Sequence, residues 1–222
     1  MTTAKMDTEH ARWLALEQQI RPWMPAISAE LAQAFLQIPR ENFAPAALRG
    51  VALSDTELPT AGGQVMLCPK VQVRLVHELQ LKTTDRVLQI GAGTGYMTAL
   101  IAQLAAQVVA YEYQGELANT ARLNLLQAGI NNAQIIAADI TESQTTGVFD
   151  AIVFCGGVAQ LPTAWAQRLK DGGRLVAILG QDPMMRTTVL TRHSETHNSQ
   201  TQPWDTLAPY LRGFEPAPSF AL

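Results

Sequence analysis

Glycines at alternating positions, Gly91, Gly93 and Gly95, separate an apolar run from an amphipathic segment in the sequence LQIGAGTGYM. This order is typical of the turn between a buried strand and a helix, which is where open α/β sheets bind ligands. The three glycines would let a ligand pack against bare backbone. The dinucleotide fingerprint GxGxxG needs a small residue at the position of Tyr96, so a pyrophosphate ligand is disfavoured.

Two acidic residues follow the next two apolar runs. Glu112 ends the run VVAYE, and Asp139 ends the run AQIIAAD. Carboxyl ends of parallel strands meet at one edge of a sheet, so both acids are predicted to lie beside the glycine loop. Glu112 could accept hydrogen bonds from both ribose hydroxyls of an adenosine, and Asp139 suits the adenine amino group. The alternative for each is an ordinary surface or helix-capping acid.

Apolar runs alternate with amphipathic segments in the middle of the chain. Strands are expected at 86–90, 108–112, 133–139, 149–155 and 173–180, and helices at 71–81, 94–107, 116–129 and 161–170. Short continuous apolar runs indicate a parallel sheet that is covered on both faces, with right-handed crossovers. Beyond Gly180, the segments 187–193 and 204–211 predict two antiparallel strands joined by the polar residues 194–203.

The N-terminal part of the chain is predicted to form a helical cap. Helices are expected at 7–20 and from Ser28, a good N-cap, to about Gln37, whereas residues 42–70 are irregular. Irregular segments of this length are usually functional or disordered, and the apolar content of this one argues against disorder.

These patterns predict an α/β fold with a doubly wound, mostly parallel seven-stranded sheet and an antiparallel C-terminal hairpin. We expect one domain over residues 1–222. Its expected parts are the cap and active-site loop (1–80), the cofactor-binding α/β core (81–180) and the C-terminal hairpin (181–222).

Composition limits the classes of partner. Hydrophobic residues make up 47% of the chain and charged residues 16%, which is enough apolar material for a large core. The net charge of −3 gives no concentrated basic surface, so we expect no binding to nucleic acid or to an anionic membrane. The N-terminal residues lack a secretion-signal pattern, and no apolar run approaches the ~20 residues that span a bilayer. A cytoplasmic location is expected.

Potential metal ligands are few and badly spaced. Cys68 and Cys155 follow no zinc or redox pattern and are predicted to behave as small buried hydrophobic residues. His193 and His197 lie in a polar stretch that reads as a hairpin loop and lacks a third ligand. No metal site is therefore expected. The sequence carries no signal for the oligomeric state.

The glycine loop, with an acid after each of the next two strands, resembles that of the class I S-adenosylmethionine-dependent methyltransferases. The resemblance implies that the loop packs against the methionine part and ribose of S-adenosylmethionine, which carry no phosphate. The residues that it assigns to the cofactor are Gly91, Ala92, Gly93, Thr94, Gly95, Glu112, Asp139 and Ile140.

A closer resemblance covers most of residues 28–180. The segments IPRENFAP, LPTAGGQVMLCPK, DRVLQIGAGTGYMTALIA, FDAIVFCGGVAQLP and LKDGGRLVAILG come in the order seen in protein-L-isoaspartate O-methyltransferases. This resemblance implies methyl transfer from S-adenosylmethionine to the misplaced carboxylate of isoaspartyl residues in damaged proteins or peptides. S-adenosylhomocysteine would be the product, and the ester would cyclise to a succinimide that reopens in part as aspartate.

The family carries a serine in a GQTIS pattern, with its hydroxyl near the substrate carboxylate. Aligned on Gly63 and Gln64, this chain has Val65 in place of the threonine and Leu67 in place of the serine. Neither side chain donates a hydrogen bond. The resemblance therefore assigns Gln64 and Leu67 to catalytic positions, and Gly63, Val65, Met66 and Cys68 to substrate-binding positions. It also implies that residues 60–69 line the acceptor site. Two alternatives stay open: an acceptor such as a small metabolite, and a protein that binds the cofactor without catalysis.

Two further groups of residues have a functional and an ordinary interpretation. Lys70 and Arg74 could form a positive rim that draws in an anionic substrate, or could lie on a solvated helix face. Trp13, Trp23 and Met24 could cover the cofactor as a lid, although ordinary packing is the usual role of such residues.

Overall fold

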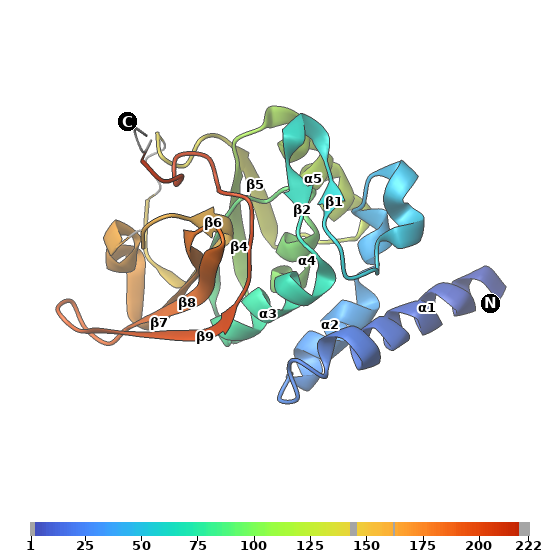
Figure 1. Cartoon of the computed structure of the whole chain (residues 1–222), viewed down its shortest axis with the longest axis horizontal. Helices are drawn as coiled ribbons and strands as arrows, with labels where there is room; N and C mark the ends of the chain where they lie inside the picture. Colours follow the sequence, from blue (N-terminus) through green and yellow to red (C-terminus); the bar gives the residue numbers. More distant parts are fainter. Residues whose placement is uncertain (1–2, 143–145, 162, 218–222) are drawn as a thin grey trace.

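A seven-stranded sheet forms the centre of the molecule (Figure 1). The structure, a computed structural model, describes residues 3–142, 146–161 and 163–217. The strands run in the order β5-β4-β3-β6-β7-β8-β9. Their bounds are β3 (Arg86–Ile90), β4 (Gln107–Glu112), β5 (Ala133–Ala137), β6 (Phe149–Val158), β7 (Leu169–Gln181), β8 (Met184–Arg192) and β9 (Asn198–Asp205). The first five strands in this order, from β5 through β3 to β7, pair in parallel. Strands β8 and β9 are antiparallel, which confirms the predicted fold class.

The direction of winding reverses at β3. From β3 the chain moves outward to β4 and then β5, and it returns to place β6 on the other side of β3. Crossovers on the two sides of such a switch point leave a crevice outside the carboxyl ends of the strands. The glycine loop follows β3 directly, so the reversal places this loop at the crevice.

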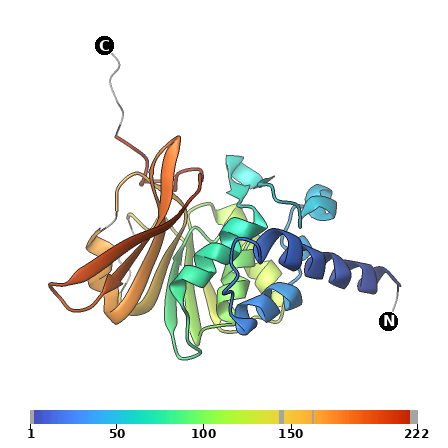
Figure 2. The ribbon, with the colours of Figure 1, turned by 60° about the horizontal axis from the view of Figure 1, so that its bottom comes forward.

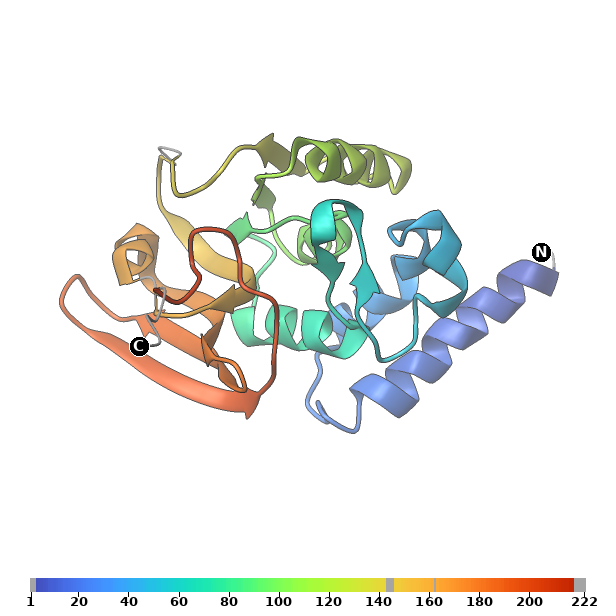
Figure 3. The same ribbon diagram turned by 45° about the horizontal axis from the view of Figure 1, so that its top comes forward.

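The two faces of the sheet are covered in different ways. The helices α3 (Pro69–Leu79), α4 (Tyr96–Ala102) and α5 (Gly115–Gln127) share one core cluster on the first face (Figure 3). On the second face, the Phe154 ring lies 6.2 Å from that of Trp165 and 5.1 Å from that of Phe214, centroid to centroid. Trp165 belongs to the short 3₁₀ helix η5 (Thr163–Arg168), so the second face has a thin cover that includes the C-terminal segment.

The N-terminal cap is helical, as predicted. Helix α1 (Thr3–Ala15) continues as a π-helix η1 (Leu16–Ile20), and α2 (Ala29–Gln37) follows. The Ser28 hydroxyl accepts a hydrogen bond from the Leu31 N–H at 3.2 Å, which confirms the predicted N-cap. Figure 2 shows α1 and the β8–β9 hairpin at opposite ends of the molecule. Among the described residues, no helix has the length and apolar character needed to cross a membrane.

The segment predicted to be irregular has local structure. Two 3₁₀ helices, η2 (Arg40–Asn42) and η3 (Ala46–Val51), precede a two-stranded ladder. In that ladder β1 (Leu58–Pro59) pairs with β2 (Val65–Met66) around the 3₁₀ turn η4 (Ala61–Gly63). The ladder closes the glycine-containing loop into a hairpin, so the expected acceptor segment has a fixed shape.

Two element predictions are wrong. The helix expected at 161–170 is only the 3₁₀ turn η5, because β7 already begins at Leu169, which pairs with Phe149. The last strand is not 204–211 but β9, which includes most of the polar stretch taken for a loop. Strand β9 lies at the edge of the sheet with mostly exposed residues, so its sequence lacks the apolar alternation that marks a half-buried strand.

Candidate functional site

The glycine loop has backbone angles that side chains rarely adopt. Gly91, Gly93 and Gly95 have φ angles of 84°, 55° and 91°. At Gly95 a Cβ would lie 3.2 Å from Ala121 of α5, so this glycine allows two helices to pack closely. At Gly91 a Cβ would lie 2.8 Å from Leu211, so the C-terminal segment covers this part of the loop.

Glu112 lies beside this loop, where the sequence predicted it. Only 4% of the residue is exposed. Its Oε2 accepts a hydrogen bond from the Gly93 N–H at 2.8 Å, and its Oε1 accepts one from the Gln114 N–H at 3.1 Å. Burial raises the pKa of the Glu112 carboxyl, and these backbone donors offset part of that rise. A carboxylate has about four acceptor sites, so Glu112 retains capacity for a ligand hydroxyl.

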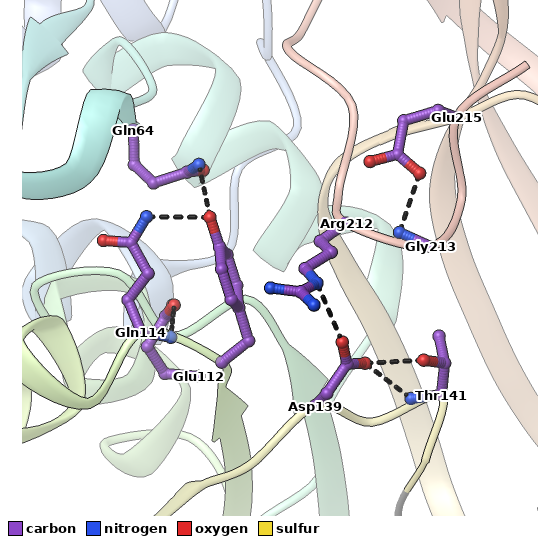
Figure 4. A network of polar contacts seen from close by, with 9 residues as sticks. Gln64, Glu112, Gln114, Asp139, Thr141, Arg212, Gly213 and Glu215 are labelled. Atoms are coloured by element: carbon purple, nitrogen blue, oxygen red, sulfur yellow. Dashed lines mark hydrogen bonds and ion pairs between the residues drawn. The ribbon is translucent and has the colours of Figure 1, made fainter.

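Asp139 lies just beyond β5 at the same edge. Its Oδ1 accepts hydrogen bonds from the Thr141 hydroxyl at 2.7 Å and the Thr141 N–H at 3.0 Å. Its Oδ2 lies 3.1 Å from Nε of Arg212 (Figure 4). The hydrogen bond from the Thr141 hydroxyl lowers the pKa of Asp139, and the Arg212 charge adds to this effect. Asp139 is therefore a carboxylate at neutral pH.

A narrow cleft lies beside Asp139 and Gly91. Its volume is about 30 Å³. It is lined by Ile90, Gly91, Tyr111, Tyr113, Ala138, Asp139, Ile140, Leu211 and Arg212. The acids, the apolar walls and the bare loop suit an adenosine. The side chains of Leu211 and Arg212 also line this cleft and leave it too small for an adenosine. The remaining residues fit an adenosine once those two side chains are displaced.

The expected acceptor segment is tied to the end of β4. The Tyr113 hydroxyl accepts a hydrogen bond from the Gln64 amide at 3.0 Å and another from the Gln114 amide at 2.7 Å. Gln114 also donates to the Gly62 carbonyl at 3.0 Å. Figure 4 shows the Gln64 and Gln114 side chains directed toward the same hydroxyl, Gln64 from the hairpin and Gln114 from the segment after β4. These contacts hold the glycine-containing hairpin beside the residue that follows Glu112.

The predicted substrate-binding residues divide into two groups. Gly63 is exposed and Gln64, Val65 and Cys68 are half-buried, so these four can be reached from solvent. The side chains of Met66 and Leu67 lie in the core, with 4% of each residue exposed. Leu67 therefore presents its backbone, and not its side chain, to polar neighbours.

Arg40 is a positioning residue that the sequence analysis missed. It is completely buried, and its guanidinium donates to the Ala52 carbonyl at 2.7 Å, to the Leu67 carbonyl at 2.8 Å and to the Gln72 amide oxygen. It also lies 5.2 Å from the ring centroid of Tyr96, the first residue of α4. Burial lowers the pKa of Arg40 to about 10, so it stays charged at neutral pH. The available sequence signal was the family segment IPRENFAP, which contains Arg40.

Lys70 and Arg74 do not form a shared rim. Lys70 makes an ion pair with Asp55 at 2.7 Å, and the Arg74 guanidinium lies 4.0 Å from the ring centroid of Trp204 in β9. Each charge is therefore already engaged by a different neighbour.

The aromatic residues of the cap lie away from the cleft residues. Trp13 and Trp23 are exposed, and Trp13 stacks on His10 with centroids 5.9 Å apart. Met24 is buried in the main core. The tryptophans thus neither pack into the core nor line the narrow cleft.

The two histidines stand in the turn between β8 and β9, as predicted for a hairpin loop. The rings of His193 and His197 have centroids 5.1 Å apart. Within the described ranges, no group of three or more His, Cys, Asp or Glu residues could hold a metal ion.

Comparison with known proteins gives the family. Residues 16–207 match the family model described as Protein-L-isoaspartate(D-aspartate) O-methyltransferase. The chain belongs to this family. Members are S-adenosylmethionine-dependent methyltransferases, so the predicted family and cofactor class are confirmed together.

Similar methyltransferases occur in other organisms. The chain is 39% identical over 163 residues to Protein-L-isoaspartate O-methyltransferase 1 of Rhodopseudomonas palustris strain HaA2, across 72% of this chain and 66% of that protein. It is 36% identical over 173 residues to the Protein-L-isoaspartate O-methyltransferase of Syntrophus aciditrophicus, across 78% of this chain and 79% of that protein. The chain thus spans about two thirds or more of the length of these relatives.

Solved structures agree on the fold. A protein-L-isoaspartate O-methyltransferase structure superposes with a TM-score of 0.76 at 23% identity, over 93% of this chain and 66% of that chain. A putative member from Plasmodium falciparum, solved in complex with S-adenosyl-L-homocysteine, superposes with a TM-score of 0.75 at 19% identity, over 92% of this chain and 98% of that chain.

Proposed function

We propose that this chain transfers a methyl group from S-adenosylmethionine to the side-chain carboxylate of isoaspartyl residues in proteins or peptides. The observation that carries the proposal is the pair of hydrogen bonds that ties the Gly62–Gln64 turn to Tyr113 and Gln114, the two residues after Glu112. These bonds bring the expected acceptor segment to the edge of the sheet that carries the two acids and the glycine loop.

The reaction asks little acid–base chemistry of the protein. A carboxylate with a pKa near ~4 is ionised at neutral pH, so the nucleophile needs no general base. S-adenosylmethionine supplies an electrophilic methyl group on a sulfonium. The protein has to hold the carboxylate oxygen in line with that carbon and to exclude water. The absence of a catalytic triad in the sequence is consistent with this chemistry.

Glu112 and Asp139 divide the binding of the nucleoside. Glu112 would accept hydrogen bonds from the ribose hydroxyls while it holds the Gly93 N–H, and Asp139 would accept from the adenine amino group. Tyr113 and Ile140 line the same cleft and would supply apolar contacts to the base. Charge-assisted hydrogen bonds of this kind are shorter and stronger than neutral ones.

The acceptor carboxylate would be held without the family's serine. Gly63 is exposed and nothing lies within 4 Å of the place that a Cβ would take, so its backbone is open to a ligand. The Gln64 amide nitrogen carries two N–H groups, and its bond to Tyr113 uses one of them. We infer that this turn, together with the second Gln64 N–H, replaces the serine hydroxyl.

Paired peptides test the proposal. Labelled S-adenosylmethionine is supplied with two peptides that differ only in an aspartyl or isoaspartyl linkage. Label on the isoaspartyl peptide alone is expected, and Glu112→Gln should reduce it. Equal label on both peptides, or label on neither, contradicts the proposed acceptor.

A small-metabolite acceptor is the second candidate, because Leu67 removes the serine hydroxyl and Val65 adds an apolar surface beside the turn. The same assay separates it from the first. Binding of S-adenosylhomocysteine in calorimetry, with label on neither peptide, would favour the metabolite acceptor or a non-catalytic binding role.

A further inference from the structure

The segment that follows β9 crosses the carboxyl edge of the sheet. We name residues 209–214 the C-terminal strap. Gly157 donates its N–H to the first strap residue at 2.8 Å, and its carbonyl accepts the Leu211 N–H at 2.9 Å. The Ala159 N–H donates to the Phe214 carbonyl at 2.8 Å. Backbone hydrogen bonds to the end of β6 thus fix the path of the strap over the crevice.

Two strap side chains enter the candidate cofactor cleft. Leu211 covers Gly91, because a Cβ on Gly91 would lie 2.8 Å from its Cδ2. Arg212 Nε lies 3.1 Å from Asp139 Oδ2, and its guanidinium carbon lies 5.2 Å from the ring centroid of Tyr113. Figure 4 shows the Arg212 side chain directed toward Asp139.

The Arg212 guanidinium therefore has the features expected of an adenine in this place. It is planar and carries N–H donors, it lies near the Tyr113 ring, and it donates to Asp139. The remaining cleft of about 30 Å³ is far below the roughly 300–1,000 Å³ of small-molecule sites. Because the Arg212 side chain lines the little space left beside Asp139, a nucleoside can enter this part of the cleft only when that side chain moves.

We propose that Arg212 is an internal competitor for the adenine end of the cofactor cleft, and that it sets the cofactor affinity. This inference rests on the proposed function, which places adenine on Asp139. Cofactor binding then requires Arg212 to leave Asp139, and the apparent dissociation constant is the intrinsic one divided by the fraction of molecules in the open arrangement.

Salt should weaken this competition. The Arg212 side chain is 61% exposed, and ion pairs at exposed positions are screened by salt. S-adenosylhomocysteine carries no net charge at neutral pH, so its own attraction to the site depends less on salt. The affinity of the wild-type chain should therefore increase with salt, and that of a chain without Arg212 should change less.

Calorimetry with S-adenosylhomocysteine tests the inference on the full chain. Arg212→Ala and Arg212→Gln are expected to bind roughly two- to tenfold more tightly than wild type at low salt. This advantage should shrink at high salt. Arg186→Ala is the matched control, because its ion pair with Asp205 lies on the β8–β9 hairpin. The control removes the same charge and should bind like wild type.

The possible outcomes are distinct. If wild type binds the nucleoside and both Arg212 variants bind equally or more weakly, the competition is refuted while the cofactor site stands. If wild type and all variants fail to bind, both the cofactor assignment and the competition are refuted. Equal tightening by Arg186→Ala would show a general charge effect and would also refute the competition.

Discussion

One carboxylate at the end of β4 is hydrogen-bonded both to the glycine loop and to the segment that leads into α5. Glu112 accepts from the Gly93 N–H and the Gln114 N–H, so its position is fixed before any ligand binds. Its identity and place were predictable, because an acid at the carboxyl end of a parallel strand must lie at the edge of the sheet that carries the glycine loop. Arg40 was not predictable in role, because its three acceptors lie on segments distant in the sequence.

Removal of the Glu112 carboxylate tests the cofactor assignment at this scale. Glu112→Ala should cost roughly 1.5–3 kcal/mol of S-adenosylhomocysteine affinity for each charged hydrogen bond that is lost. Glu116→Ala is a suitable control, because Glu116 is an exposed acid in the first turn of α5. Unchanged affinity of the Glu112 variant in calorimetry would contradict the assignment.

The same carboxyl gives the affinity a pH dependence. Burial raises the pKa of Glu112, whereas the Thr141 hydroxyl lowers that of Asp139. As the pH falls, Glu112 therefore takes up a proton first and loses acceptor capacity for the ribose hydroxyls. Cofactor affinity should decline on acidification above the ordinary glutamate range of about 4.3. A Glu112→Gln chain, titrated over the same pH range, should show no such decline.

Loss of Arg40 should destabilise the cap and acceptor segment. Arg40→Met leaves the carbonyls of Ala52 and Leu67 buried without this donor, which should cost about 1–3 kcal/mol of unfolding free energy for each group. Arg21→Ala, which breaks an exposed ion pair with Glu17, should change stability by about 0.5 kcal/mol or less. Equal urea midpoints for the two variants would contradict the anchoring role.

At the scale of elements, the Gly62–Gln64 hairpin turn is the part of the proposed site that would contact the methyl acceptor. Its position depends on two hydrogen bonds between segments far apart in the chain: Gln114 donates to the Gly62 carbonyl, and Gln64 donates to the Tyr113 hydroxyl. The family resemblance of the segment LPTAGGQVMLCPK implied that residues 60–69 line a site. It could not predict the contact with Tyr113, which only the tertiary fold creates.

Two neighbouring glycines separate the effect of strain from that of contact. Both Gly62 and Gly63 have positive φ angles, so an alanine at either should cost about 1 kcal/mol. Only at Gly62 would the new Cβ collide with the Gln114 side chain, whereas nothing lies near it at Gly63. Gly62→Ala should therefore raise KM for an isoaspartyl peptide more than Gly63→Ala. Equal KM values would argue against the Gln114 contact.

Strand prediction succeeded and failed for physical reasons. The buried strands β3 and β4 have continuous apolar runs, because both faces are covered, and they were located closely. Strand β9 is exposed at the sheet edge and polar, so its sequence resembles a loop. The strand that should hold 204–211 ends at Asp205, and the following residues form the strap instead.

At the scale of the whole molecule, the reversal at β3 brings the glycine loop, two acids and the C-terminal strap to one edge. The alternation of strands and helices predicted a doubly wound sheet, and the ends of two apolar runs located the acids. It did not predict that the strap returns across the sheet, because that path depends on backbone bonds to Gly157 and Ala159. The candidate cofactor cleft is therefore lined both by residues at the ends of β3, β4 and β5 and by the C-terminal strap.

A crystal structure with S-adenosylhomocysteine is the most direct test of the central claim that the nucleoside lies on these acids. We expect the ribose hydroxyls on Glu112, the adenine beside Tyr113 and Ile140, and Arg212 displaced from Asp139. Density for the nucleoside at a site that does not include Glu112 would contradict the account.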